Sequence, residues 1–348
     1  MRRIIYIAPH KSSFVMKDID LLQSHFRVKF QAFSGKGVLA VLRGAMKQIF
    51  FLARNLPFSA GIIVMFGGYH AFLPSLLGRI FRKKVAIILG GTDCVSFPSI
   101  NYGTFRKGIQ AKVTCASYRL ANLLLPVHHS LMLREDTYYT VDSRFQGCQY
   151  WCPGLRTPFR ELHNGYRAYP FDPDAQRKDP RRFTTIAFIE DPYRISLKGI
   201  DMILSLAKEM PECSFTIIGL QSQQVGLNPG ANVTILPFLE HQELFRHLAM
   251  SRFYLQLSIS EGFPNSLCEA MLMECVPVGS QVGGIPDIIG DAGFLVSSRS
   301  VSELKRTVEK AMAEDNLDAL GRRSRERIKE LFPLEKRERG LLDVFSPS

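Results

Sequence analysis

The sequence has no apolar run long enough to cross a membrane. Its longest candidates, residues 61–66 and 85–89, have the length of strands, whereas a spanning helix needs about 18–20 consecutive apolar residues. The apolar run behind Arg2 and Arg3 is too short for the hydrophobic region of a signal peptide. We therefore expect a cytoplasmic, globular protein, and 348 residues favour two domains of about 170 residues each.

Cysteine is neither abundant nor regularly spaced. The chain contains seven cysteines: Cys94, Cys115, Cys148, Cys152, Cys213, Cys268 and Cys275. An odd number of scattered cysteines without an export signal predicts free thiols in a reducing cytosol. Cys148 and Cys152 have the spacing of half a zinc site, but no second ligand pair of matching spacing follows. We therefore expect no metal at these cysteines.

Acidic residues are scarce in the first half of the chain. Up to His163 there are 22 Lys and Arg against 7 Asp and Glu, a net charge of +15, whereas from Asn164 onward 22 basic residues face 25 acidic ones, giving −3. Basic clusters such as residues 79–84 and 106–112 predict peripheral contact of the N-terminal half with the anionic inner face of a membrane, or with another polyanion. The alternative is a solvated basic face.

Short β-branched runs alternate with longer helical stretches, which is typical of parallel sheets covered by helices. The fold class is therefore α/β, with a Rossmann-like domain at residues 1–165, a proline-rich linker at 166–182 and a second Rossmann-like domain at 183–325. The predicted strands are residues 4–8, 62–66, 85–89 and 123–127 in the first domain and 186–189, 215–219, 233–236, 254–257, 276–279 and 294–296 in the second. Two amphipathic helices, 301–314 and 317–331, follow. Ligands of such sheets bind in loops after the strands.

The most informative segment is residues 258–271, directly after a predicted strand. It places Glu261 on a loop and Glu269 eight residues later. Pro264 and Asn265 mark the start of a helix with Asn265 as its N-cap, so Glu269 lies about one turn into that helix. Both carboxylates are then expected to face one pocket.

Two carboxylates around a helix N-terminus suit the parts of a nucleotide sugar. A carboxylate accepts hydrogen bonds from two neighbouring hydroxyls of a sugar or a ribose, each contributing about 1.5–3 kcal/mol. Between the two acids, the backbone N–H groups of Ser266 and Leu267 at the positive end of the helix suit a diphosphate. The segment therefore predicts a nucleotide-sugar site.

The segment resembles the E-x7-E motif of retaining GT-B glycosyltransferases of the family-4 type, with Gly262, Phe263 and Pro264 inside the motif. The resemblance implies that Glu261 holds the hydroxyls of the donor sugar and that Glu269 holds the nucleotide ribose. It also implies a GT-B fold, with the acceptor on the first domain, the donor on the second and a C-terminal helix, residues 326–348, that crosses back to the first domain. The implied activity is hexosyl transfer from a UDP- or GDP-linked sugar to a glycan or lipid-linked acceptor, with retention, in bacterial-type surface polysaccharide or glycolipid biosynthesis.

Further stretches match the same family. Arg194 and Lys198 resemble the basic loop that binds the diphosphate, where two cations would offset the negative charge of the leaving group. Gly283 and Gly284, followed by Asp287, resemble a glycine-rich loop whose backbone approaches the donor. The stretch 163–166 resembles the Asn-Gly turn that ends the first domain.

The first domain departs from the family pattern. Where a histidine is common, after the strand 85–89, this chain has Asp93, which is expected either to contact the acceptor or to cap a helix. His10 follows the first strand and either lines the cleft or serves as a turn residue. His128 and His129 follow another strand and either face the cleft or are solvated.

Other functions fit the sequence less well than the transferase does. A metal-dependent GT-A enzyme needs an Asp-x-Asp at a strand end, but Asp18 and Asp20 fall in a predicted helix and Asp172 and Asp174 in the linker. We therefore expect no metal and no cofactor, with Lys198 and Arg194 in place of the cation. A sugar-nucleotide epimerase of the same architecture remains an alternative. A nucleic-acid-binding module is less favoured, because it leaves the Glu261 segment unexplained.

Overall fold

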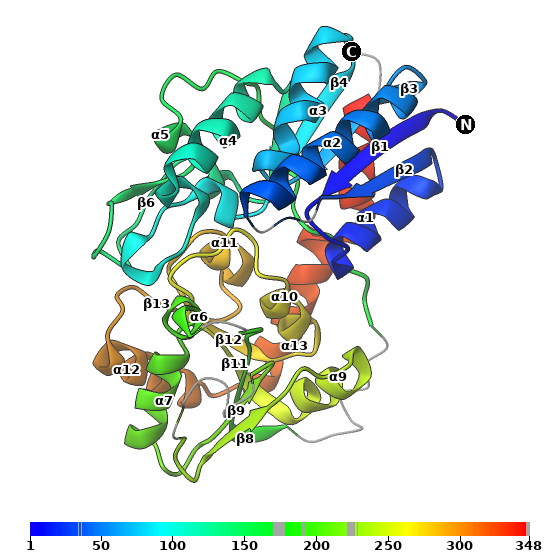
Figure 1. The fold of residues 1–348 in the computed structure, drawn as a ribbon. Coiled ribbons are helices and arrows are strands. Elements are labelled where there is room, and N and C mark those ends of the chain that lie inside the picture. Colours follow the sequence, from blue (N-terminus) through cyan, green and yellow to red (C-terminus); the bar gives the residue numbers. More distant parts are fainter. Residues whose placement is uncertain are drawn as a thin grey trace.

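The computed structural model describes residues 1–33, 35, 37–169, 178–189, 192–220, 227 and 229–345. The chain forms two domains, each built on a parallel sheet and stacked one above the other in Figure 1. Among the helices of these described residues, none is long and apolar enough to span a bilayer.

The N-terminal domain has a five-stranded parallel sheet in the order β2-β1-β3-β4-β5. Its strands are β1 Arg3–Ala8, β2 Arg27–Ala32, β3 Ser59–Met65, β4 Lys84–Leu89 and β5 Leu123–Pro126. Its helices are α1 Ser13–Gln23, α2 Val38–Asn55, α3 Tyr69–Ile80, α4 Gly108–Leu120 and α5 Cys148–Trp151, and a short hairpin pairs β6 Arg134–Glu135 with β7 Phe145–Gln146. The four predicted strands are confirmed with shifted ends. Strand β2 was missed, because it lies at the sheet edge and has no continuous apolar run.

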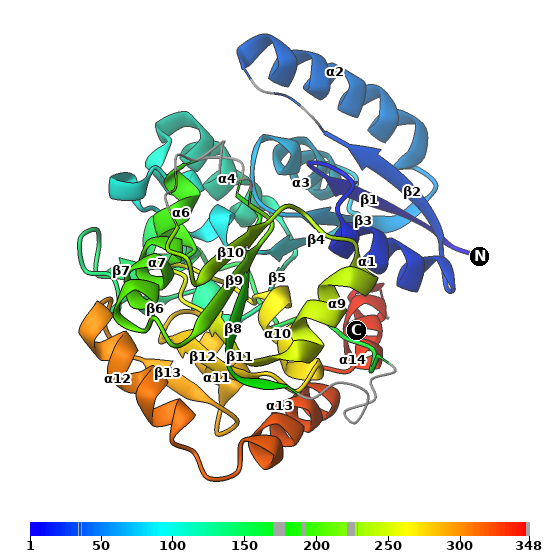
Figure 2. The same cartoon turned by 90° about the horizontal axis from the view of Figure 1, so that it is seen from below.

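The C-terminal domain has a six-stranded parallel sheet in the order β10-β9-β8-β11-β12-β13. Its strands are β8 Asp179–Ile186, β9 Ser214–Ile218, β10 Val233–Leu236, β11 Ser251–Gln256, β12 Val276–Ser280 and β13 Phe294–Val296. Its helices are α6 Tyr193–Leu197, α7 Ile200–Glu209, α9 His241–Met250, α10 Asn265–Leu272, α11 Ile285–Ile289, α12 Val301–Met312 and α13 Leu317–Leu331, and α14 Leu334–Leu342 follows. Figure 2 shows this domain from below, with β8 to β11 at its centre.

The position predicted for the first strand of this domain was wrong. The prediction of residues 186–189 started the strand too late, since β8 begins at Asp179 inside the range assigned to the linker. Its first residues, which include Arg181 and Arg182, are polar and largely exposed, so they do not resemble a buried strand. Residues 170–177 of the linker lie outside the described residues.

Two segments that connect the domains run side by side. The backbone N–H of Tyr166 donates to the carbonyl of Phe332, and the N–H of Leu334 donates to the carbonyl of Tyr166, both over 2.9 Å. After Pro333, helix α14 packs against α1 of the N-terminal domain. The C-terminal helix therefore returns to the domain in which the chain began.

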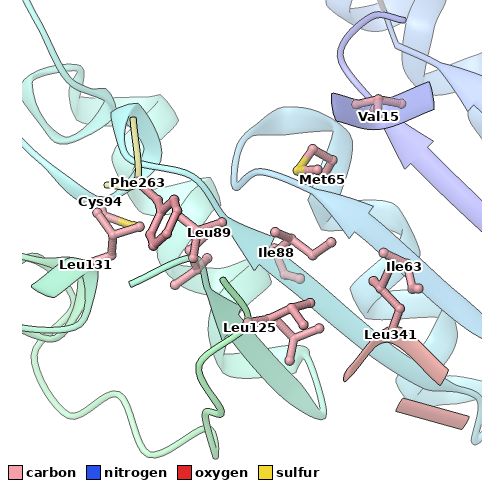
Figure 3. Packing of buried hydrophobic residues seen from close by; sticks show 14 of the residues in the cluster. Val15, Ile63, Met65, Ile88, Leu89, Cys94, Leu125, Leu131, Phe263 and Leu341 are labelled. Carbon is pink, nitrogen blue, oxygen red and sulfur yellow. The ribbon is translucent and has the colours of Figure 1, made fainter. Parts of the chain in front are cut away.

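One apolar core reaches from the N-terminal domain across the domain boundary. Phe263, which belongs to the loop before α10, is 6% exposed and belongs to the same cluster as the strands of the first sheet. Figure 3 shows it among Leu89, Cys94 and Leu131 of the N-terminal domain. Burial of such a ring contributes about 1.5–3 kcal/mol, so the loop with the E-x7-E motif also joins the two domains.

The prediction that all cysteines are free was wrong. Cys115 of α4 and Cys152, which follows α5, form a disulfide, with their Cα atoms 5.5 Å apart. The two residues are 37 positions apart in the sequence, and the chain after α5 runs along α4, where Arg119 donates to the carbonyl of Pro153 over 2.8 Å. Cys94, Cys148, Cys213, Cys268 and Cys275 are free and buried.

A buried ion pair fixes helix α14 to the N-terminal domain. The guanidinium of Arg337 donates two hydrogen bonds to the carboxylate of Asp18, 2.8 and 2.7 Å long, and Tyr6 donates a third from its hydroxyl. Arg337 also donates to the carbonyls of Leu162 and His163. Asp18 is 1% exposed and Arg337 3%, so the Asp18 carboxylate serves as the buried partner of Arg337, whereas Asp20 is exposed.

Replacing Arg337 tests this anchor. We expect Arg337→Met to lower the free energy of unfolding by about 3–5 kcal/mol, because it leaves the Asp18 carboxylate buried without its partner. The control Arg339→Met, at an exposed position of the same helix, should change it by less than about 0.5 kcal/mol. Urea denaturation measures both, and equal losses in the two variants would refute the anchoring role.

Candidate active site

A cavity of about 550 Å³ lies between the domains at the carboxyl ends of the C-terminal strands. Of the residues predicted for the donor and for catalysis, it brings together Arg194, Lys198, Glu261, Phe263, Pro264, Asn265, Ser266 and Glu269. The N-terminal domain supplies α1 with Ser13, Phe14 and Lys17. The cavity has the size and the mixed charge expected of a small-molecule site.

Lys198 and Glu261 form an ion pair in the wall of the cavity. Lys198 ends helix α6, and Gly199 follows it with φ +70°; a Cβ there would lie 2.3 Å from the carbonyl oxygen of Leu257. Only glycine allows this close approach at this backbone conformation. The N–H of Ile259 then donates to the carbonyl of Leu197 over 2.9 Å, so the loop after β11 and the turn after α6 are joined beside the pair.

Hydrogen bonds from buried polar side chains hold the Glu261 carboxylate in place. Ser258 donates its hydroxyl to Glu261 over 2.9 Å, and the amide of Gln256 lies 3.4 Å from the same oxygen. Gln256 also donates to Ser258 and accepts from Ser266 of α10. Sequence reasoning missed Gln256 and Ser258, although both precede Glu261 by a few residues at the end of a buried strand. They orient the carboxylate toward the cavity.

Arg194 and Lys198 lie one helical turn apart on the same side of α6. The backbone N–H of Lys198 donates to the carbonyl of Arg194 over 2.9 Å, and both side chains line the cavity, Arg194 in an exposed position. Two cations one turn apart can contact two oxygens of one diphosphate.

Glu269 lies in α10 and lines the same cavity. Burial raises the pKa of its carboxyl above the ordinary value, while the charges of His241 and Lys17 act in the opposite direction. The pKa of Lys17 is lowered by burial, against the effect of Glu269. Its ammonium donates to the carbonyl of Gly165 over 3.3 Å. Lys17 was missed, because it reaches the site from the other domain.

The start of α10 differs in one respect from the prediction. Pro264 is the N-cap, and Asn265 is the first helical residue and makes no cap hydrogen bond. The Asn265 side-chain oxygen instead accepts from the amide of Asn164 and the hydroxyl of Tyr166, so it ties the domain boundary to the helix. Ser266 and Leu267 lie in the first turn, where backbone N–H groups have no partner within the helix, and the Leu267 side chain is fully buried.

Gly262 in the loop after β11, and Gly283 and Gly284 in the loop before α11, allow close packing. A Cβ on Gly262 would lie 2.7 Å from the carbonyl oxygen of Gly90 in the N-terminal domain. A Cβ on Gly283 would lie 1.9 Å from the carbonyl oxygen of Glu261, and one on Gly284 would lie 2.5 Å from that of Gly262. These glycines therefore hold the Glu261 loop against its neighbours; their predicted contact with a donor stays a prediction.

A second cavity, of about 300 Å³, lies at the carboxyl ends of the N-terminal strands, and Asp93 lines it. The Asp93 carboxylate is buried and accepts from the backbone N–H groups of Gly67, Gly90 and Gly91 and from the hydroxyl of Tyr118. It therefore ties the loops after β3 and β4 together and shapes the cavity wall.

The three candidate histidines line neither of these cavities. His10 is exposed and lines neither of them. His128 is 2% exposed and lies 2.9 Å from Asp287 of α11 through Nε2, and its Nδ1 contacts Ser130. The side chain thus bridges the domains and is not solvated, whereas His129 is exposed.

The two facing parallel-sheet domains with a charged cleft define an α/β protein of GT-B architecture. Sucrose-phosphate synthase from Thermosynechococcus elongatus has a similar fold, with a TM-score of 0.71 and 13% identity over 99% of this chain and 98% of that one. HepE from Anabaena, solved with UDP and glucose, has a TM-score of 0.65 and 13% identity over 99% of both chains.

Sequence comparison gives the family. Residues 193–330 match the model of glycosyl transferases group 1. N-acetyl-alpha-D-glucosaminyl L-malate synthase of Bacillus anthracis is 36% identical over 281 residues, which cover 77% of this chain and 69% of that protein. The chain belongs to the glycosyl transferases group 1 family, and these matches do not favour the epimerase alternative. It spans 32% to 45% of the length of other curated relatives that it matches.

The raised pKa of Glu269 predicts that its carboxylate lowers the stability of the folded protein although it serves binding. Because burial raises the pKa of this carboxyl above its ordinary value, the ionised form costs folding stability, and this cost disappears as the pH falls through the raised pKa. We expect Glu269→Gln to raise the melting temperature at pH 7.5, with a gain that shrinks toward pH 5. Differential scanning fluorimetry across pH measures it.

The same variant should weaken nucleotide binding. Loss of a charge-assisted hydrogen bond costs about 1.5–3 kcal/mol, which is about tenfold or more in Kd. Glu309→Gln, at an exposed position of α12, is the matched control and should change neither quantity. A Glu269→Gln protein that is less stable at pH 7.5 and binds nucleotide normally would contradict this role.

Proposed function

We propose that the protein is a metal-independent hexosyltransferase that moves a sugar from a UDP- or GDP-linked donor to a glycan or lipid-linked acceptor. The observation that carries the proposal is that Glu261 and Glu269 line one cavity, with Lys198 and the first turn of α10 beside them. Along the chain, Glu261, the first turn of α10 and Glu269 follow one another in the order of sugar, diphosphate and ribose in a nucleotide sugar.

In the proposed complex, Glu261 accepts hydrogen bonds from the hydroxyls of the donor sugar, and Glu269 accepts them from the ribose. Lys198 and Arg194 neutralise the charge that grows on the diphosphate as the glycosidic bond breaks. Contact between the domains excludes water, which would otherwise compete with the acceptor. Retention of configuration is proposed by resemblance to the E-x7-E enzymes.

Support for a nucleotide donor comes from a relative in fold. HepE was solved with UDP and with UDP-glucose, and its fold matches 99% of this chain. The acceptor is proposed to bind at the N-terminal cavity that Asp93 lines, and the basic N-terminal domain is proposed to contact an anionic membrane. A glycolipid or surface polysaccharide pathway fits such an acceptor.

Replacing Glu261 tests the catalytic centre. We expect Glu261→Gln to lower kcat/KM for sugar transfer by about 10²–10³-fold, because a group aimed at the reacting sugar is lost. Lys198→Met should cost as much, and the double variant little more, since the two act as a unit. Glu309→Gln is again the control, and near-normal transfer by Glu261→Gln would overturn the assignment.

Removing metal ions tests whether Lys198 and Arg194 take the place of a metal ion at the diphosphate. We expect unchanged turnover after dialysis against EDTA, because Lys198 and Arg194 supply the positive charge. In the part of the chain that the structure describes, the group suited to a metal is His128, His129 and Glu161, with ligand atoms within 4.8 Å of one another. None of the three lines the donor cavity. Complete loss of turnover, restored by a divalent ion, would refute metal independence.

A further inference from the structure

Helix α2 turns its apolar side outward. Its buried residues are Gln48, Leu52 and Asn55, two of which are polar. Its exposed large apolar residues, between 46% and 77% exposed, are Val38, Leu39, Leu42, Met46, Ile49 and Phe50. A surface helix normally buries its apolar stripe, and a contiguous exposed apolar patch marks a contact surface.

The inner side of α2 is fixed, so the helix cannot rotate to bury this stripe. The Gln48 amide donates to the carbonyl of His70 over 2.9 Å. A Cβ on Gly44 would lie 2.9 Å from the ring of Phe33, so the helix lies directly on that ring. The outward direction of the apolar residues is therefore set by packing. Figure 2 shows α2 at the outer edge of the N-terminal domain.

The apolar surface continues from α2 onto α3. A groove of about 330 Å³ between them has apolar walls, which include Ile49, Leu77 and Phe81. Ile80 and Phe81, at the end of α3, are 61% and 59% exposed. We call this surface, from Val38 to Phe50 on α2 and including Ile80 and Phe81, the α2–α3 face.

The charge around the α2–α3 face has one sign. Residues 21–92 contain ten Lys and Arg and no Asp or Glu. Arg43 and Lys47 lie exposed on α2 itself, and Arg79 and Arg82 lie exposed beside the end of α3. A second copy of the chain would bring like charges together on this face. A bilayer with anionic lipid accepts both the apolar side chains and the cations.

We propose that the α2–α3 face docks on an anionic lipid bilayer, with α2 in the plane of the interface. The same helix borders the N-terminal cavity, since Val41 lines it. Docking therefore brings that cavity to the membrane surface, where a lipid-linked acceptor is held. The docking rests on the membrane contact proposed above for the N-terminal domain and names the face that makes it; the step to the acceptor rests on the proposed transfer activity.

The experiment is sedimentation of the full chain with vesicles. We expect binding to vesicles of phosphatidylcholine with phosphatidylglycerol, weak binding to phosphatidylcholine alone, and weaker binding as salt rises. The variant Leu42→Ser/Phe50→Ser should lose binding. The charge reversal Arg43→Glu/Lys47→Glu should lower the partition coefficient by about tenfold or more. All four side chains are exposed, so folding should persist.

Matched controls lie elsewhere on the surface. Arg306→Glu/Lys310→Glu reverses two exposed charges with the same spacing on α12, and Val141→Ser removes an exposed apolar side chain. Both should bind vesicles like the wild type.

Three results would overturn the proposal. The first is equal vesicle binding by all variants, and the second is no vesicle binding by the wild type. The third is a dimer, seen by sedimentation velocity, that Leu42→Ser/Phe50→Ser disrupts, because the face would then join two copies. Transfer to a water-soluble acceptor is measured separately. Its absence would refute the proposed function without affecting vesicle binding.

Discussion

The contact between Lys198 and Glu261 depends on the neighbouring strands β8 and β11, whose carboxyl ends lie at the same edge of the sheet. Glu261 follows β11 and Lys198 follows β8, and these strands are neighbours in a parallel sheet, so the loops behind them meet at one edge. The side chains of Lys198 and Glu261 are 27% and 13% exposed. At this depth each charge requires the other in the unliganded protein. In the proposed reaction, a diphosphate replaces Glu261 as the partner of Lys198 and leaves the carboxylate to the sugar.

The loop that carries Glu261 has two roles that depend on different residues. Glu261 lines the cavity, and the next two residues, Gly262 and Phe263, contact the N-terminal domain. Ser260 adds a polar contact, since it accepts from Arg134 over 3.1 Å. Chemistry and domain contact are thus coupled in one short segment. A shift of the N-terminal domain would move Glu261 directly.

Sequence patterns predicted the features that are local in the chain. Strands with continuous apolar runs were found, and the E-x7-E spacing located Glu261, Glu269 and their helix. Edge strand β2 and the polar start of β8 were missed, because their burial depends on neighbouring strands. The Cys115–Cys152 bond, and the approach of Lys17 to Glu269, depend on tertiary packing that spacing does not encode. Amphipathic periodicity in α2 also does not tell which side faces the core.

The most direct test of the account is a crystal structure of the protein with a bound nucleotide sugar. The account predicts the diphosphate within hydrogen-bond distance of the Lys198 ammonium and the first turn of α10, the ribose at Glu269 and the sugar at Glu261. A nucleotide bound in the N-terminal cavity beside Asp93, with both glutamates free of it, would contradict the account.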